Sequence, residues 1–206
     1  MSDVTNDIGN TIPEQKEGSQ SNIEESIEAD NEEQAKKIFV QAKNRLLSVN
    51  CWKEISGDIS ASFTLTNEQG NRLTREAQPG DYLKIDIPGP GSKTGEGYDW
   101  VKVEAVENKP ANSSSDEGCV MRVRPSANPT DNDDKVAHFF DENATSNFIV
   151  EREGRIVRAK IYGRNEKPNT DTHKPLDNLR NAVIGGTAAS GLSFVQWKKL
   201  AKGLIE

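Results

Sequence analysis

Residues 79–107 read PGDYLKIDIPGPGSKTGEGYDWVKVEAVE, two alternating segments on either side of a loop rich in glycine and proline. In the first segment Leu83 and Ile85 fall two positions apart, and in the second Val101 and Val103 repeat this spacing. Because successive strand residues point to opposite sides, each segment has one apolar face and one polar face. The stretch therefore predicts two strands of a half-buried sheet, joined by a long loop.

The rest of the chain extends this pattern. Further strands are expected at 59–66, 118–124, 147–152 and 155–162, and helices at 31–47, from Pro175 and from Ser193. Half-buried strands with short or polar connections favour antiparallel pairing. The predicted fold class is α+β: a mainly antiparallel curved sheet or small barrel of about six or seven strands, flanked by an N-terminal helix and C-terminal helices.

Acidic charge is concentrated at the N-terminus. Residues 1–34 hold ten acidic side chains against Lys16 alone, although the whole chain carries a net charge of only −7. Residues 1–29 also contain no aromatic side chain, and such a segment cannot bury enough apolar surface to offset its ordering entropy. We therefore predict a disordered acidic tail over 1–29 and a single α+β domain over 30–206.

The compartment is inferred from what the sequence lacks. It opens with MSDVTNDIGN, which has no basic and apolar leader pattern. No run reaches the roughly 18–20 apolar residues of a membrane helix. The expected localisation is cytoplasmic, with export by a leaderless route left open.

The glycine-rich loop is the first candidate for chemistry, because it places Lys93 and Thr94 among four glycines. A Walker loop needs glycine immediately before the lysine and five residues earlier, where this chain has Ser92 and Ile87. The loop is therefore not a nucleotide-binding loop. It is either a wide turn or an anion cradle built from backbone N–H groups.

Aromatic side chains on the polar strand faces form the second candidate. Tyr82 and Trp100 share their polar faces with Lys84 and Lys102, and Tyr98 lies at the loop exit. Such rings suit a platform for a ligand or peptide. The alternative is that they pack under another element as a second core layer.

Basic side chains form the third candidate. Arg122, Arg124 and Arg158 lie on the polar sides of their strands, where they would make an anion-binding face or a merely solvated one. Binding to nucleic acid is not favoured, because no aromatic and basic RNA motif is present.

Catalytic patterns are sparse. His138 and Asp141 would share a face if their segment were helical, and they would then form an acid/base pair; otherwise His138 is a packed core residue. No metal, cofactor or nucleophile motif is found, so no catalytic residue, metal ligand or cofactor is assigned. The pair Gly185 and Gly186 allows close helix packing or self-association.

Several strings carry a family resemblance: GDYLKIDIPGPGSKTGEGYDWVKVE, VAHFF, YGRNEKPNT and LSFVQWKKL. They resemble a group of uncharacterised bacterial proteins of the Bacteroidota type, over residues 49–205. That group has no assigned activity, so the resemblance implies no catalytic or binding residue.

Three functions follow from these patterns. The first is a non-enzymatic binding or assembly module for an unknown protein partner. The alternative is a carrier of a small hydrophobic ligand, which should show a cavity of several hundred Å³ between sheet and helix. The third is an enzyme using His138 and Asp141, which should place His138 in a cleft with perturbed titration.

Overall fold

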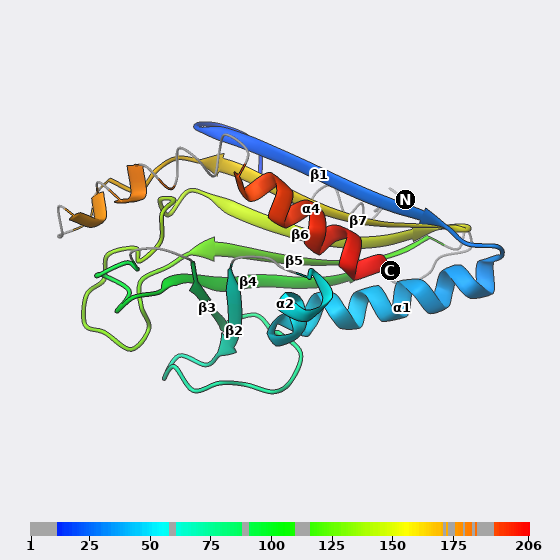
Figure 1. Cartoon of the computed structure of the whole chain (residues 1–206), viewed down its shortest axis with the longest axis horizontal. Coiled ribbons are helices and arrows are strands. Elements are labelled where there is room, and N and C mark those ends of the chain that lie inside the picture. Colours follow the sequence, from blue (N-terminus) through cyan, green and yellow to red (C-terminus); the bar gives the residue numbers. More distant parts are fainter. Residues whose placement is uncertain are drawn as a thin grey trace, which may run out of the picture.

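A computed structural model of the chain describes residues 12–57, 61–87, 91–109, 116–170, 172, 176–178, 180–182, 184 and 192–206. The strands are β1 (Ser19–Glu28), β2 (Ser62–Thr66), β3 (Tyr82–Asp86), β4 (Asp99–Lys109), β5 (Glu117–Pro125), β6 (Thr145–Glu153) and β7 (Ile156–Glu166). The helices are α1 (Glu32–Leu47), the 3-10 turn η2 (Val49–Cys51), α2 (Trp52–Ile55) and α4 (Leu192–Ile205). The strands form one curved, open, seven-stranded sheet of order β1-β7-β6-β5-β4-β3-β2, entirely antiparallel (Figure 1). The predicted α+β class is confirmed.

The two long helices lie on the same face of the sheet. Helix α4 packs on β1 and β7, α1 packs on β6 and β7, and the two helices contact each other (Figure 1). We call the face that they cover the inner face, and the opposite one the outer face. The prediction of which strand residues point inward is correct for the central strands, since Leu83, Ile85 and Val103 all belong to the core cluster.

Aromatic rings fill the middle of the inner face. Trp52 is fully buried and its ring lies 4.8 Å from that of Phe148 and 5.2 Å from that of Phe63. Trp197 of α4 completes the group, 5.5 Å from Phe148. These contacts tie α2, β2, β6 and α4 into one core.

The acidic N-terminal segment differs from the prediction. Ser19–Glu28 is not part of a disordered tail over 1–29 but forms edge strand β1, paired along β7. Ile23 is buried, and acidic side chains pair with cations from neighbouring elements, as Glu24 does with Arg158 at 3.5 Å. An edge strand needs only one apolar side, so a high charge does not prevent folding. The first eleven residues lie outside the described residues.

Helix α1 begins at Glu32, close to the prediction, because Asn31 is its N-cap. The Asn31 side-chain oxygen accepts a hydrogen bond from the backbone N–H of Gln34 at 2.9 Å. The predicted helix start at Pro175 and the Gly185 and Gly186 pair lie outside the described residues.

Three connections leave the same end of the sheet, which we call the loop end. They are the β3–β4, β5–β6 and β7–α4 connections. The β7–α4 connection includes helical residues 176–178 and 180–182, orange in Figure 1. The contacts of Asp99, Asp177 and Arg180, described next, lie at this end.

Candidate functional site

The glycine-rich loop holds an anion, but that anion is a carboxylate of the chain itself. The backbone N–H groups of Lys93 and Thr94 donate to Asp177 at 3.0 and 2.7 Å, and the Thr94 hydroxyl donates at 2.7 Å. Burial alone would raise the pKa of Asp177, but the hydrogen bonds from Lys93 and Thr94 outweigh it and lower the pKa. Lys93 therefore contributes through its backbone, and its side chain is exposed.

A buried ion pair fixes the same helical segment. Arg180 donates to both carboxylate oxygens of Asp99, at 2.5 and 3.2 Å, and both side chains are buried. We call the contacts of Asp99, Asp177 and Arg180 the polar latch. The segment buries polar side chains, while Leu176 is 59% exposed, the reverse of an ordinary amphipathic helix.

His138 and Asp141 do not form the predicted acid/base pair. Residues 135–143 are not helical, so the two side chains do not share a helix face. His138 Nδ1 accepts the backbone N–H of Phe140 at 3.0 Å, and its ring stacks on that of Phe139. Burial lowers the pKa of His138 to about 4, whereas Asp141 Oδ1 accepts from the Asn143 N–H. His138 is thus a packed, neutral residue.

The three aromatic side chains of the predicted platform differ in their burial. Trp100 is only 3% exposed and donates from Nε1 to the Gly95 carbonyl at 3.3 Å. It therefore packs beneath the glycine-rich loop, in agreement with the alternative that these rings pack under another element. Tyr82 and Tyr98 are half-buried. The Lys84 ammonium lies 3.7 Å from the Tyr98 ring centroid.

The predicted basic face is largely neutralised by nearby carboxylates. Arg122 donates to Glu104 at 2.9 Å and Arg124 also binds Glu104, whose pKa is lowered by these pairs although burial opposes the shift. Arg158 pairs with Glu153 at 3.1 Å, in addition to its contact with β1. Arg158 therefore belongs to a paired face rather than to an anion site.

The strand side of the inner face is closed, whereas α4 becomes exposed towards the loop end. Leu65 and Leu83 are at most 1% exposed, and their neighbours nearer the loop end, Phe63 and Ile85, are also buried, at 8% and 7%. Along the stripe of α4 that faces inward, Ala201 is fully buried but Phe194 is 46% exposed.

Trp197 joins α4 to strand β2, because the centroid of its half-buried ring lies 6.0 Å from that of the Phe63 ring. We call Phe63, Ile85, Phe194 and Trp197 the open apolar end. The helix expected from Ser193 forms as α4, and of its two aromatic side chains Phe194 is exposed and Trp197 is half-buried.

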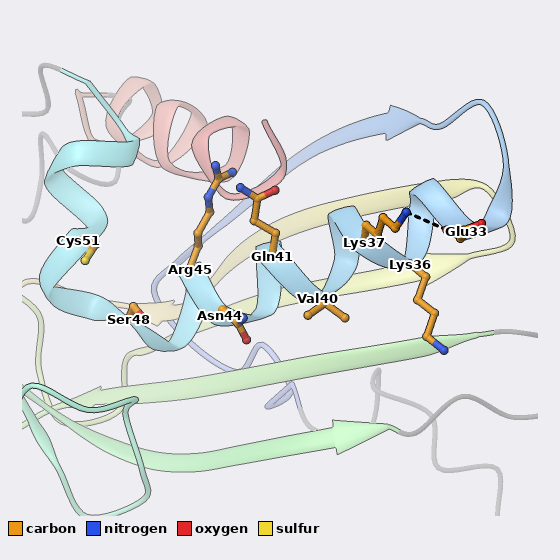
Figure 2. Close-up of a pocket in the computed structure, with 9 residues that line it drawn as sticks. All are labelled: Glu33, Lys36, Lys37, Val40, Gln41, Asn44, Arg45, Ser48 and Cys51. Carbon is orange, nitrogen blue, oxygen red and sulfur yellow. Dashed lines mark hydrogen bonds and ion pairs between the residues drawn. The ribbon is translucent and has the colours of Figure 1, made fainter.

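An open groove of about 700 Å³ runs along the exposed side of α1 (Figure 2). It is lined by Glu33, Lys36, Lys37, Val40, Gln41, Asn44, Arg45, Ser48 and Cys51. All of these residues come from α1 and the turn that follows it. The groove therefore lies outside the core, not between the sheet and α4 where a carrier cavity is expected.

Two further features bear on the class of site. Within the described ranges, no group of three or more His, Cys, Asp or Glu side chains converges as a metal site would require. In the same part of the chain, none of the helices has the length and apolar character needed to cross a bilayer.

Comparisons with known proteins give only distant structural likenesses. No family model and no curated protein matches the sequence. Truncated norcoclaurine synthase from Thalictrum flavum is similar at 10% identity and a TM-score of 0.38, over 94% of this chain and 99% of that one. Major latex-like protein 151 from Panax ginseng is similar at 10% identity and a TM-score of 0.34, over 84% of this chain and 96% of that one. Protein Ms6760 from Mycobacterium smegmatis is similar at 13% identity and a TM-score of 0.34, over 92% of this chain and 97% of that one. Scores at this level transfer neither a ligand nor an activity to this chain.

Proposed function

We propose that this protein binds a small apolar molecule at the open apolar end, between the first turns of α4 and the adjoining residues of β2 and β3. One observation carries the proposal. Phe194 lies on the same stripe of α4 as the fully buried Ala201 and Leu204, yet it is 46% exposed. An apolar stripe that continues beyond the packed core offers surface that a ligand can remove from water.

The size of the effect can be worked out from Phe194. An aromatic side chain presents about 150–250 Å², so its exposed half corresponds to about 100 Å². At about 25 cal/mol per Å², covering that surface contributes about 2.5 kcal/mol, or about 60-fold in Kd. This is enough to make the residue a dominant contact for a small ligand.

The packing of the core limits the shape of the ligand. Trp52 and Phe148 fill the centre of the inner face, so a ligand lies at the loop end rather than deep under α4. Trp197 borders that position and provides a fluorescent reporter. The other two tryptophans are buried elsewhere, Trp52 in the core and Trp100 on the outer face.

Two measurements test the proposal. Native mass spectrometry of the purified full chain should show an added mass that is lost on denaturation. Titration with 1-anilinonaphthalene-8-sulfonate should give fluorescence that Phe194→Ser weakens by at least tenfold in affinity. Val195→Ser is the matched control, because Val195 is 57% exposed on the neighbouring stripe of the same helix.

The outcome with the control decides the matter. Unchanged affinity in Val195→Ser, together with weakened affinity in Phe194→Ser, supports binding at the open apolar end. Equal affinity in the two variants, or absence of probe binding to the wild-type chain, would overturn the proposal.

A further inference from the structure

The outer face of the sheet carries a second surface, separate from the apolar one. It consists of Tyr82, Lys84, Tyr98, Lys102 and Arg124, which we call the tyrosine–lysine patch. Tyr82 of β3 pairs in register with Lys102 of β4, which pairs in turn with Arg124 of β5. Lys84 occupies the adjacent row, opposite Trp100.

Aromatic rings position both lysines. The Lys84 ammonium lies 3.7 Å from the Tyr98 ring centroid and 5.7 Å from that of Trp100. The Lys102 ammonium lies 5.5 Å from the Tyr82 centroid. The ring quadrupole attracts a cation in this arrangement and reduces the number of conformations that the long side chain samples.

The patch has an excess of positive charge. Lys102 and Arg124 lie directly opposite each other, an arrangement that costs stability in a sheet. Glu104 is shared by Arg122 and Arg124, and neither lysine forms an ion pair within the described part of the chain. The acid nearest to Lys84 along its own strand face is the exposed Asp86.

The other half of the outer face is different. There Lys160 pairs with Glu151 at 2.5 Å and Arg158 with Glu24 at 3.5 Å. Cations are therefore matched by carboxylates on β6, β7 and β1 but not on β3 and β4. The unmatched cations lie where the half-buried tyrosines also lie.

We propose that the tyrosine–lysine patch binds an extended acidic segment of a partner protein, with carboxylates at alternate positions. Lys84 and Lys102 are diagonal neighbours on adjacent strands, which places the two residues about 7–8 Å apart. Alternate side chains of an extended peptide are spaced by about 7 Å. Two carboxylates on one side of such a peptide therefore match the two ammonium groups, and the tyrosines flank them.

A single-stranded nucleic acid fits the patch less well. Its bases need open ring faces for stacking. Here each tyrosine is half-buried and has a lysine ammonium over its ring. The carboxylates of a peptide can bind the lysine ammonium groups without access to the ring faces.

The test uses the full chain and a fluorescently labelled ten-residue peptide of alternating glutamate and serine. Anisotropy titration should show binding that weakens with added salt, and the double variant Lys84→Gln/Lys102→Gln should weaken it at least tenfold. Glutamine keeps most of the aliphatic stem over the ring and removes the charge. Lys36→Gln/Lys53→Gln is the control, since it removes the same charge from two exposed lysines of α1 and α2.

Each outcome is decisive. Loss of affinity in the patch variant with retention in the control supports the proposal. Equal affinity in both double variants, absence of binding to the wild-type chain, or tighter patch-dependent binding of a ten-residue oligothymidine would overturn it. None of these results depends on whether an apolar ligand binds on the inner face.

Discussion

Glu166, the last residue of β7, is a buried carboxylate whose replacement should change the pH dependence of stability. It is 8% exposed, and its Oε1 accepts a hydrogen bond from the Ser21 hydroxyl at 3.2 Å. Gly163 leaves the room for this side chain, because a Cβ there would come within 2.0 Å of Glu166 Oε1. Burial raises the pKa of Glu166 from 4.5 to about 7, although the Ser21 hydrogen bond opposes the shift.

The sign and size of the effect follow from this shift. The folded state holds the proton more tightly than the unfolded state, so the stabilisation is complete below pH 4.5 and is lost as the pH rises through 7. A rise from 4.5 to about 7 corresponds to about 3 kcal/mol in the free energy of unfolding. Glu166→Gln keeps a neutral group in the same space, so we expect it to be more stable than the wild type by about 3 kcal/mol at pH 8, and equally stable near pH 4.5.

His138 acts in the opposite direction over an overlapping range. Burial lowers the pKa of His138 from 6.5 to about 4, so its contribution to stability is complete above pH 6.5 and is lost as the pH falls toward 4. In the wild-type chain the two titrations largely cancel between pH 4.5 and 6.5. Glu166→Gln should therefore expose a profile in which stability rises with pH over this range.

Urea unfolding followed by circular dichroism, at intervals from pH 4.5 to 8, measures these free energies. Glu54→Gln is the control, because this exposed glutamate of α2 should leave the wild-type profile unchanged. A stability difference between Glu166→Gln and the wild type that stays constant over the whole pH range would refute the reasoning. Such a result would mean that the carboxylate is ionised in the folded chain and well solvated.

Two further substitutions probe the packing of α4 and the polar latch. At Gly203, an added Cβ would lie 2.0 Å from the backbone oxygen of Ile55, so Gly203→Ala should cost about 1–3 kcal/mol in urea unfolding while the exposed Lys202→Ala costs little. Asp99→Asn removes the buried carboxylate that Arg180 binds through two nitrogens and should cost about 3–5 kcal/mol. The double replacement Asp99→Leu/Arg180→Met should recover part of that loss, and a single variant as stable as the wild type would contradict the burial of the pair.

The sheet could be predicted from sequence because its signal is local. In the central strands the two-residue period separates Leu83 and Ile85 from Tyr82 and Lys84, and the structure places the first pair in the core. The same rule located Trp100 on the outer face. The two-residue period could not show that Trp100 is buried, because the glycine-rich loop, which is distinct from the strand, covers the ring.

Strand β1 was missed because its stability is not local. Ile23 and Ile27 are the only large apolar residues of the strand, and composition alone therefore favours disorder. The strand forms because β7 pairs with it from Ser21 to Glu28 without interruption, and because cations such as Lys198 of α4 lie within reach of Glu25, at 3.6 Å. Neither partner can be read from the N-terminal segment itself.

The anion cradle shows the same limit at the candidate site. The glycine-rich loop predicted backbone N–H groups able to hold an anion, and Thr94 does hold one. The anion is Asp177, 83 residues further along the chain, and no local pattern links the two. The sequence therefore left the loop as either a wide turn or an anion cradle, and it could not identify Asp177 as the bound group.

The middle of the inner face and its loop end are held by different chemistry, and this difference bears on the binding that we propose at the loop end. Deep under α4, Leu200 and Leu204 are fully buried, and exposing them costs hydrophobic free energy in proportion to their area. At the loop end the polar latch depends on directional contacts of Asp99 and Asp177, which are lost together once the segment moves. Local opening is favoured where few apolar contacts resist it. The binding that we propose at Phe194 therefore requires no disruption of the buried aromatic core around Trp52.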